Sequence, residues 1–197
     1  MSPAAVVLTE ERILDAAEDV LRRFGPSKAT VVDVAKVLGV SHGSVYRHFA
    51  TKAALRDAVA RRWLARIAAP LAPAGGTGGT AAERLLRWLQ RLAAIKQGMA
   101  REDPELFATF SQLTTEAREV VAEHVDHLVA QLSEIVAEGV RSGEFAAADQ
   151  AAAGRALLYA TARFHHPLHA GEWGDPAISD ELVEVWRLLV HGLAVRP

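Results

Sequence analysis

A short run of hydrogen-bond donors lies in the first third of the sequence. Tyr46, Arg47 and His48 are consecutive, and Lys52 follows one helical turn after His48. Phenol, guanidinium, imidazole and ammonium groups all donate hydrogen bonds to phosphate oxygens, and aromatic rings can stack on bases. These residue types at this spacing predict a nucleic-acid contact.

Histidines form a second group that could carry chemistry. Two sets have spacings that suit metal ligands on helices, His124-x-x-His127 and His165-His166-x-x-His169. A zinc hydrolase would also need a general base, and the sequence contains neither His-Glu-x-x-His nor a nucleophile motif. We therefore expect pocket or core histidines, with no metal, no cofactor and no catalytic residue. A metal-dependent hydrolase built on this histidine cluster remains the alternative function in which the protein is an enzyme.

Composition and charge favour a globular protein with a basic N-terminal part. Half of the 197 residues are hydrophobic, 23% are charged and none is cysteine. Residues 1–70 carry 11 Lys and Arg against 7 Asp and Glu, whereas residues 71–197 carry 11 against 17. The N-terminus has no basic region followed by a long apolar run, so we expect a cytoplasmic protein without a membrane partner.

Four helices are expected to position the donor run. The expected N-caps of these helices are, in order, Thr9, Thr30, Ser41 and Thr51. Gly25-Pro26 is expected to end the first helix, and Gly39 the second. The second and third helices are short and separated by Gly39-Val40-Ser41, which is typical of a helix-turn-helix. In the first helix the expected apolar face ends at Phe24.

The third helix should present its N-terminus to a partner. Val45 and Phe49 are its apolar positions, so the other side chains point outward. Small residues at Gly43 and Ser44 would let the helix end approach a surface closely, and its free amides favour phosphate. A helical protein-interaction module is a further alternative, but it would leave the donor run unexplained.

The stretch TVVDVAKVLGVSHGSVYRHFATKAAL, residues 30–55, closely resembles the DNA-binding domain of the tetracycline-repressor (TetR) family of transcriptional regulators. The resemblance implies a ligand-responsive regulator, a repressor released from its double-stranded DNA operator by a small-molecule effector, and not an enzyme. The DNA-binding positions that it implies are Thr30, Ser41, His42, Gly43, Ser44, Tyr46, Arg47, His48 and Lys52. His42 stands where a longer polar residue is common, so bidentate reading of guanine is not expected there.

After a Pro- and Gly-rich connector at residues 69–80, helical periodicity continues to the C-terminus. We expect an all-α protein of about nine helices, with a DNA-binding domain at 1–52 and a ligand-binding and dimerisation domain at 53–197. Helices are predicted at about 115–142 and 148–166, among others. The family resemblance implies a homodimer through the last two helices, and the stripe around Trp186 and Leu189 fits that role.

The same resemblance implies a mainly apolar effector held among the helices of the second domain. Large apolar residues at helical spacing and a few polar residues on the same faces are the candidates for this site. The expected ligand-binding residues are Trp88, Leu92, Phe107, Phe110, Leu113, Val121, His124, Leu128, Thr161, Phe164 and His165.

Overall fold

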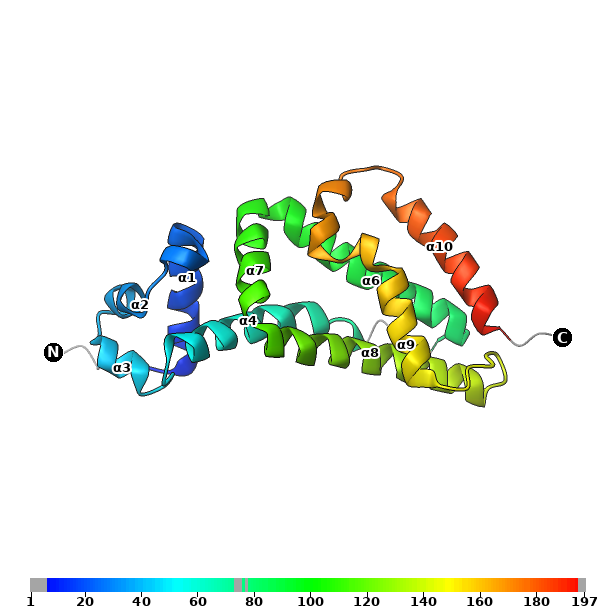
Figure 1. Ribbon diagram of the computed structural model, residues 1–197, viewed down its shortest axis with the longest axis horizontal. Coiled ribbons are helices and arrows are strands. Elements are labelled where there is room, and N and C mark those ends of the chain that lie inside the picture. Colours follow the sequence, from blue (N-terminus) through cyan, green and yellow to red (C-terminus); the bar gives the residue numbers. More distant parts are fainter. Residues whose placement is uncertain (1–6, 73–75, 77, 195–197) are drawn as a thin grey trace. The chain divides into compact units, whose positions relative to one another are not determined.

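The computed structural model describes residues 7–72, 76 and 78–194. Within these residues the structure is helical and has no strand, apart from an isolated bridge between Phe145 and Ala194 (Figure 1). The prediction of an all-α protein is confirmed. The chain forms two compact units. Unit 1 is the described part of Met1–Trp63 together with Glu105–Val121, and unit 2 is the described part of Leu64–Pro104 and Ala122–Pro197.

Unit 1 contains the first helices and a later one. Its elements are α1 (Glu10–Lys28), α2 (Val31–Leu38), α3 (His42–Tyr46), the first part of α4 (Lys52–Ala68) and α7 (Pro104–Glu116). Helix α1 breaks at Gly25, where φ is 73°, a left-handed conformation that favours glycine. This is the interruption that Gly25-Pro26 predicted, although a last helical turn follows it.

Apolar side chains from these helices make the core of unit 1. Ile13 and Val20 of α1 and Val45 of α3 are completely or almost completely buried. Phe24 was expected on the buried face of α1, but it is 51% exposed, so that expectation was wrong. The break at Gly25 follows directly, and the apolar face of the helix ends one turn earlier, at Val20 and Leu21.

Aromatic and ionic contacts tie α4 to its neighbours in unit 1. Trp63 stacks flat on Phe110 of α7, with ring centroids 5.1 Å apart and planes 6° apart. Such a stack stabilises by about 0.5–1.5 kcal/mol beyond the burial of the rings. On the other side, the Arg62 guanidinium donates to Glu18 and Asp15 of α1, both at 2.8 Å. Arg62 is therefore a structural residue that holds α1 and α4 together.

Unit 2 contains the remaining helices. They are α6 (Ala81–Glu102), most of α8 (Arg118–Arg141), α9 (Gln150–Ala160), the 3-10 turns η1 (Ala162–Phe164) and η2 (Pro167–Glu172), and α10 (Ile178–Leu193). No described helix is long and apolar enough to cross a lipid bilayer.

Two predicted helices have different limits in the structure. The helix expected at 115–142 begins at Arg118, because the preceding helix α7 continues to Glu116 and the helical conformation is interrupted between the two. The helix expected at 148–166 ends at Ala160, where the hydroxyl of Thr161 donates to the carbonyl of Leu157 at 2.8 Å. That hydrogen bond satisfies a terminal carbonyl, and the chain tightens into η1 instead of continuing as an α-helix.

A close approach joins α8 and α9. A Cβ atom added to Gly154 of α9 would lie 2.9 Å from the backbone nitrogen of Ser133 and 3.0 Å from the carbonyl oxygen of Val129. The first distance is shorter than side-chain Cβ atoms show, and the second is tighter than most of their contacts. Glycine at position 154 is what lets the two helices pack at this distance.

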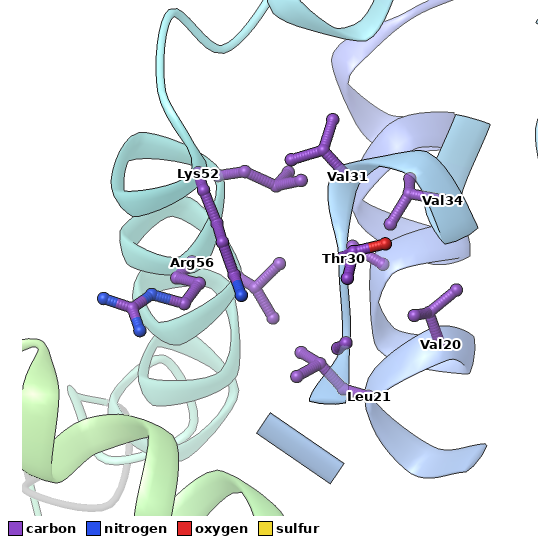
Figure 2. A pocket seen from close by; sticks show the side chains of 11 residues that line it. Val20, Leu21, Thr30, Val31, Val34, Lys52 and Arg56 are labelled. Atoms are coloured by element: carbon purple, nitrogen blue, oxygen red, sulfur yellow. The ribbon is translucent and has the colours of Figure 1, made fainter. Parts of the chain in front are cut away.

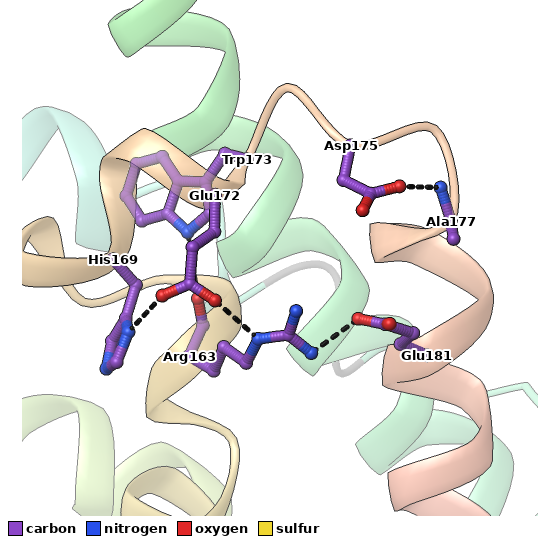
Figure 3. Close-up of polar contacts among 7 residues, drawn as sticks. All are labelled: Arg163, His169, Glu172, Trp173, Asp175, Ala177 and Glu181. Carbon is purple, nitrogen blue, oxygen red and sulfur yellow. Dashed lines mark hydrogen bonds and ion pairs between the residues drawn. The ribbon is translucent and has the colours of Figure 1, made fainter.

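A polar network fixes the segment between α9 and α10 (Figure 3). The Arg163 guanidinium donates to Glu172 at 2.8 Å and to Glu181 of α10 at 2.5 Å. The indole N–H of Trp173 donates to the carbonyl oxygen of Arg163 at 2.8 Å. His169 is paired with Glu172 at 2.8 Å. These contacts connect η1 and η2 to the first turn of α10.

Helix α10 buries the side chain that we expected in a dimer interface. Trp186 is only 5% exposed, together with Ile178 and Leu182 on the same face, and α10 packs on α6. Trp186 is therefore covered within its own chain, in the core of unit 2. Leu188 of the same helix is 78% exposed.

Candidate functional site

The helix-turn-helix is built from local signals. Thr30 accepts the Asp33 N–H while Asp33 accepts the Thr30 N–H, which makes a capping box at the start of α2. Gly39 ends α2 with φ 67° and ψ 30°, and the Val40 N–H donates to the carbonyl of Ala35 at 3.0 Å. Ser41 then caps α3 by accepting the Ser44 N–H.

Helix α3 exposes most of the residues expected to meet DNA. Seven of the nine candidates are exposed, namely Thr30, Ser41, His42, Gly43, Tyr46, Arg47 and Lys52. The other two, Ser44 and His48, are half-buried. Val45 is completely buried, as its spacing predicted. The exposed candidates of α3 and its two ends thus belong to one short stretch that a buried valine anchors.

Hydrogen bonds hold several of these side chains in place before any ligand arrives. The hydroxyls of Ser41 and Ser44 lie 2.9 Å apart, and the Arg47 guanidinium donates to the Ser44 hydroxyl at 3.1 Å. The rings of His42 and Tyr46 meet edge to face, with centroids 6.4 Å apart. The Thr30 hydroxyl donates to the Asp33 carboxylate at 2.5 Å, so its own hydrogen is already engaged.

A small cavity lies between α1, α2 and α4 (Figure 2). Its volume is about 30 Å³, and most of its lining is apolar. A volume of this size holds no more than a few water molecules, so an effector-sized ligand does not fit in it. Thr30 at the start of α2 and Lys52 and Arg56 on α4 line opposite sides of it. Arg56 is also paired with Glu116 of α7.

Two family models match the chain. Residues 13–59 match the bacterial regulatory proteins of the tetR family, and residues 81–186 match the tetracyclin repressor-like C-terminal domain. The chain belongs to the TetR family. The two matches confirm the family expected from residues 30–55. As a TetR-family chain, it combines a helix-turn-helix domain with a tetracyclin repressor-like C-terminal domain.

Relatives and solved structures agree with this assignment. The HTH-type transcriptional regulator Rv1255c of Mycobacterium tuberculosis is 31% identical over 111 residues, which are 56% of this chain and 53% of the relative. The chain thus spans about half the length of the curated relatives it matches. The FadR regulator of Bacillus subtilis, solved with stearoyl-CoA, has a TM-score of 0.68 at 21% identity and covers 93% of this chain and 99% of its own. A protein from Rhodococcus sp. RHA1 has a TM-score of 0.67 at 22% sequence identity, and the match covers 99% of this chain and 100% of that protein. These two structures support the fold.

The expected ligand-binding residues divide between the two units of this TetR-family chain. Phe107, Phe110, Leu113 and Val121 lie in unit 1, where the first three are buried. The others lie in unit 2, where Trp88, Leu92, Leu128, Thr161, Phe164 and His165 are buried and His124 is half-buried. Unit 2 therefore holds all of the polar candidates.

The polar candidates of unit 2 come close together. Nε2 of His165 lies 3.2 Å from the carbonyl oxygen of Leu158 and 3.3 Å from the hydroxyl of Thr161. Burial, followed by the charge of Lys96, lowers the pKa of His165 to about 3. The same two causes, with a smaller one from His127, lower the pKa of His124 to about 3. Both imidazoles are therefore neutral at physiological pH.

Sequence reasoning missed Lys96, which is 8% exposed. A signal was present, because Lys96 follows Leu85, Leu89 and Leu92 at the spacing of the buried face of α6. Ile95, the apolar residue directly before it, is only half-buried. Burial lowers the pKa of Lys96 from 10.5 to about 8.

The histidines do not converge on a metal position. In the described part of the chain, no three His, Asp or Glu side chains lie together as metal ligands would. His127 contacts the side chain of Gln131 at 2.9 Å, His165 contacts Thr161, and His169 is paired with Glu172. These contacts account for the rings of His127, His165 and His169 separately, and they give no support to a metal-dependent hydrolase.

Proposed function

We propose that this TetR-family chain is a transcriptional repressor that binds a two-fold operator and leaves it when a small, mainly apolar effector binds. The observation that carries the proposal is the exposed, pre-ordered surface of α3 on a helix-turn-helix. In this proposal the DNA-binding part is residues 1–52 and the effector-binding and dimerisation part is residues 53–197.

Side-chain chemistry supports the DNA contacts. Tyr46, Arg47, His48 and Lys52 supply donors for phosphates, and His42, Gly43 and Ser44 lie at the N-terminus of α3, where a recognition helix meets base edges. Arg47 is held toward the α3 N-terminus by Ser44, so less side-chain freedom is lost on binding.

An effector in unit 2 fits the relatives' properties. FadR of Bacillus subtilis was solved with stearoyl-CoA, a molecule with a long apolar chain. In this chain α4 begins at Lys52 in unit 1 and ends at Ala68 in unit 2. A movement of α4 on effector binding would therefore reach the DNA-binding part. By linkage, the operator must weaken effector binding by the same factor by which the effector weakens operator binding.

Exposed apolar residues support a homodimer through α9 and α10. Tyr159 of α9 is 58% exposed and Leu188 of α10 is 78% exposed. Leu188→Asp would place a charge in such an interface, and we expect monomers in sedimentation experiments. Leu168→Asp is the matched control, because Leu168 is 87% exposed in η2, outside both helices. A Leu188→Asp protein that remains dimeric would place the interface elsewhere.

The regulatory function is tested by operator selection. Sheared DNA from the source genome is passed over the purified protein, and the retained fragments are sequenced. The affinity for the enriched site is then measured from about 50 to 200 mM salt, the range in which phosphate contacts weaken. Lys52→Ala should weaken binding and lower the magnitude of the salt slope by about 0.9, because one fewer counterion is released.

A control and a cellular readout complete the test. Arg141→Ala removes an exposed charge of unit 2 and should leave both affinity and slope unchanged. A reporter gene behind the selected site should be expressed less when the chain is present. Retention of no specific fragment, or an increase in expression, would refute the repressor proposal.

A further inference from the structure

Lys96 is a buried cation without a counter-charge. It lies in unit 2 on the apolar face of α6, one helical turn after Leu92. Among the residues that the structure describes, none forms a hydrogen bond or an ion pair with it. Its pKa of about 8, lowered by burial, still leaves the amine mostly protonated at pH 7. A buried charge of this kind is costly unless something pairs with it.

His124 provides a second unsatisfied group close to Lys96. Its Nε2 atom is buried, and within the described chain it has no hydrogen-bond partner. The charge of Lys96 contributes to the lowered pKa of His124, so the two groups are electrostatically coupled although they come from α6 and α8. A neutral imidazole can carry its hydrogen on Nε2 and donate it to an oxygen atom.

His165 adjoins the same lysine but is already satisfied. A carbonyl oxygen only accepts, so the contact with Leu158 places the hydrogen of His165 on Nε2. Gln97, the residue after Lys96, donates to the carbonyl of Phe164 at 3.0 Å and so fixes the neighbouring backbone to α6. His165 is thus a fixed neutral neighbour, while Lys96 and His124 retain unused hydrogen-bonding capacity.

We propose that Lys96 and His124 form the head-group end of the effector site, and that the effector is a small amphiphile with a single carboxylate. The inference rests on the proposed function, because it assigns the chemistry of the effector that unit 2 binds. The carboxylate pairs with the Lys96 ammonium and accepts the Nε2 hydrogen of His124, which satisfies both groups together.

Charge balance selects a monoanion. The histidines beside Lys96 are neutral, so the buried cluster carries one positive charge. A carboxylate neutralises that charge, whereas a phosphate monoester would leave excess negative charge in a buried place. A metal ion would be repelled. Buried apolar side chains lie next to these groups in the chain, with Leu92 one turn before Lys96, Leu128 one turn after His124 and Phe164 beside His165. They suit an apolar tail.

The direct test is binding of matched probes to the DNA-free protein. Sodium octanoate, decanoate and dodecanoate are each compared by calorimetry with the alcohol of the same chain length. We expect at least one carboxylate to bind about tenfold or more tightly than its alcohol, since only the carboxylate forms the charge-assisted pair. Equal affinities, or no carboxylate binding, would overturn the inference.

Three variants assign the preference to its residues. Lys96→Met should reduce the preference for carboxylate over alcohol to less than about twofold while alcohol binding persists. His124→Leu should reduce it by about threefold or more. Lys28→Met removes an exposed lysine of α1 and should change nothing. Circular dichroism at 222 nm checks that each variant is helical. A preference that survives Lys96→Met would overturn the assignment.

Operator binding separates this inference from the proposed function. DNA retention by the same preparations needs no effector, so a protein that binds its operator but shows no carboxylate preference refutes only the head-group assignment. A protein that prefers carboxylates but retains no specific DNA refutes only the regulatory function. With both intact, the preferred carboxylate should release operator from the wild type, and Lys96→Met should reduce that release by about tenfold in carboxylate concentration.

Discussion

Replacing Lys96 with methionine should stabilise the protein in the absence of any ligand. The folded state lowers the pKa of Lys96 from 10.5 to about 8, which disfavours its charged form by roughly 3 kcal/mol. Methionine has a similar length and no charge, so it keeps the packing on α6 and removes that cost. We therefore expect the free energy of unfolding at pH 7 to rise by roughly 3 kcal/mol at most.

The gain must shrink in alkaline solution. Between pH 8 and 10.5 the unfolded chain holds the Lys96 proton more often than the folded chain does, so the wild type becomes more stable as the pH rises. The Lys96→Met protein lacks this group. The difference in free energy of unfolding between it and the wild type should therefore fall to roughly 1.5 kcal/mol at pH 9.5. Urea denaturation of both proteins at pH 7 and 9.5, followed by circular dichroism at 222 nm, measures the difference.

Two results would contradict this reasoning. A Lys96→Met protein that is less stable at pH 7 would mean that Lys96 makes a favourable contact in the folded state. A gain that is the same at both pH values would mean that it comes from packing and not from the buried charge. The Lys28→Met protein is the control, with no change expected at either pH, because Lys28 is exposed.

Other parts of the structure give three further predictions. Gly43→Ala should leave stability unchanged or higher, because an added Cβ would lie 3.8 Å from the Ser41 hydroxyl, an ordinary contact distance. The same change should weaken operator binding, and an unchanged affinity would remove this position from the interface. Acid should destabilise unit 2, because the unfolded chain protonates His124 and His165 near pH 6.5 while the folded chain does so near pH 3. Each histidine should lower the free energy of unfolding by roughly 2 kcal/mol at pH 5, which denaturation curves from pH 7 to 5 would test. Arg62→Met should lower the free energy of unfolding by roughly 1–3 kcal/mol, because it removes the guanidinium contacts to Glu18 and Asp15, and a neutral result would show that these ion pairs add no net stability.

The helix-turn-helix could be predicted from sequence because its signals are local. A cap such as Ser41 acts on an amide three residues away, and Gly39 determines its own left-handed conformation. The apolar spacing then requires Val45 to point inward, which leaves its neighbours exposed. Each of these effects operates within one turn, so the order of residues is sufficient to predict them.

The environment of the candidate effector site could not be predicted in the same way. Lysine is rarely buried, so the residue type at Lys96 gives no reason to predict a buried position. Whether the lysine is buried depends on α8 and on the segment after α9, which lie far away in sequence. The contact between His165 and Thr161 was expected on one continuous helix, but the structure forms it across the turn η1 that ends α9.

The environment of Trp186 on α10 differs from the expected one for a related reason. A wide apolar face tells that a helix must be covered, but it does not tell whether the same chain or a second copy covers it. In the structure Trp186 is covered within its own chain, on the helix that packs against α6, while Leu188 remains exposed two residues later. Only the tertiary contacts divide the face between the two roles.

The placement of Trp63 also gives the protein an optical probe for one unit. The chain has four tryptophans, and the other three, Trp88, Trp173 and Trp186, belong to unit 2. All four are buried, so each indole should change its emission when its surroundings become exposed to water. Subtracting the spectrum of a Trp63→Phe protein from that of the wild type would isolate the light emitted by the indole stacked on Phe110. Unit 1 could then be followed in real time while unit 2 is titrated, without an attached dye.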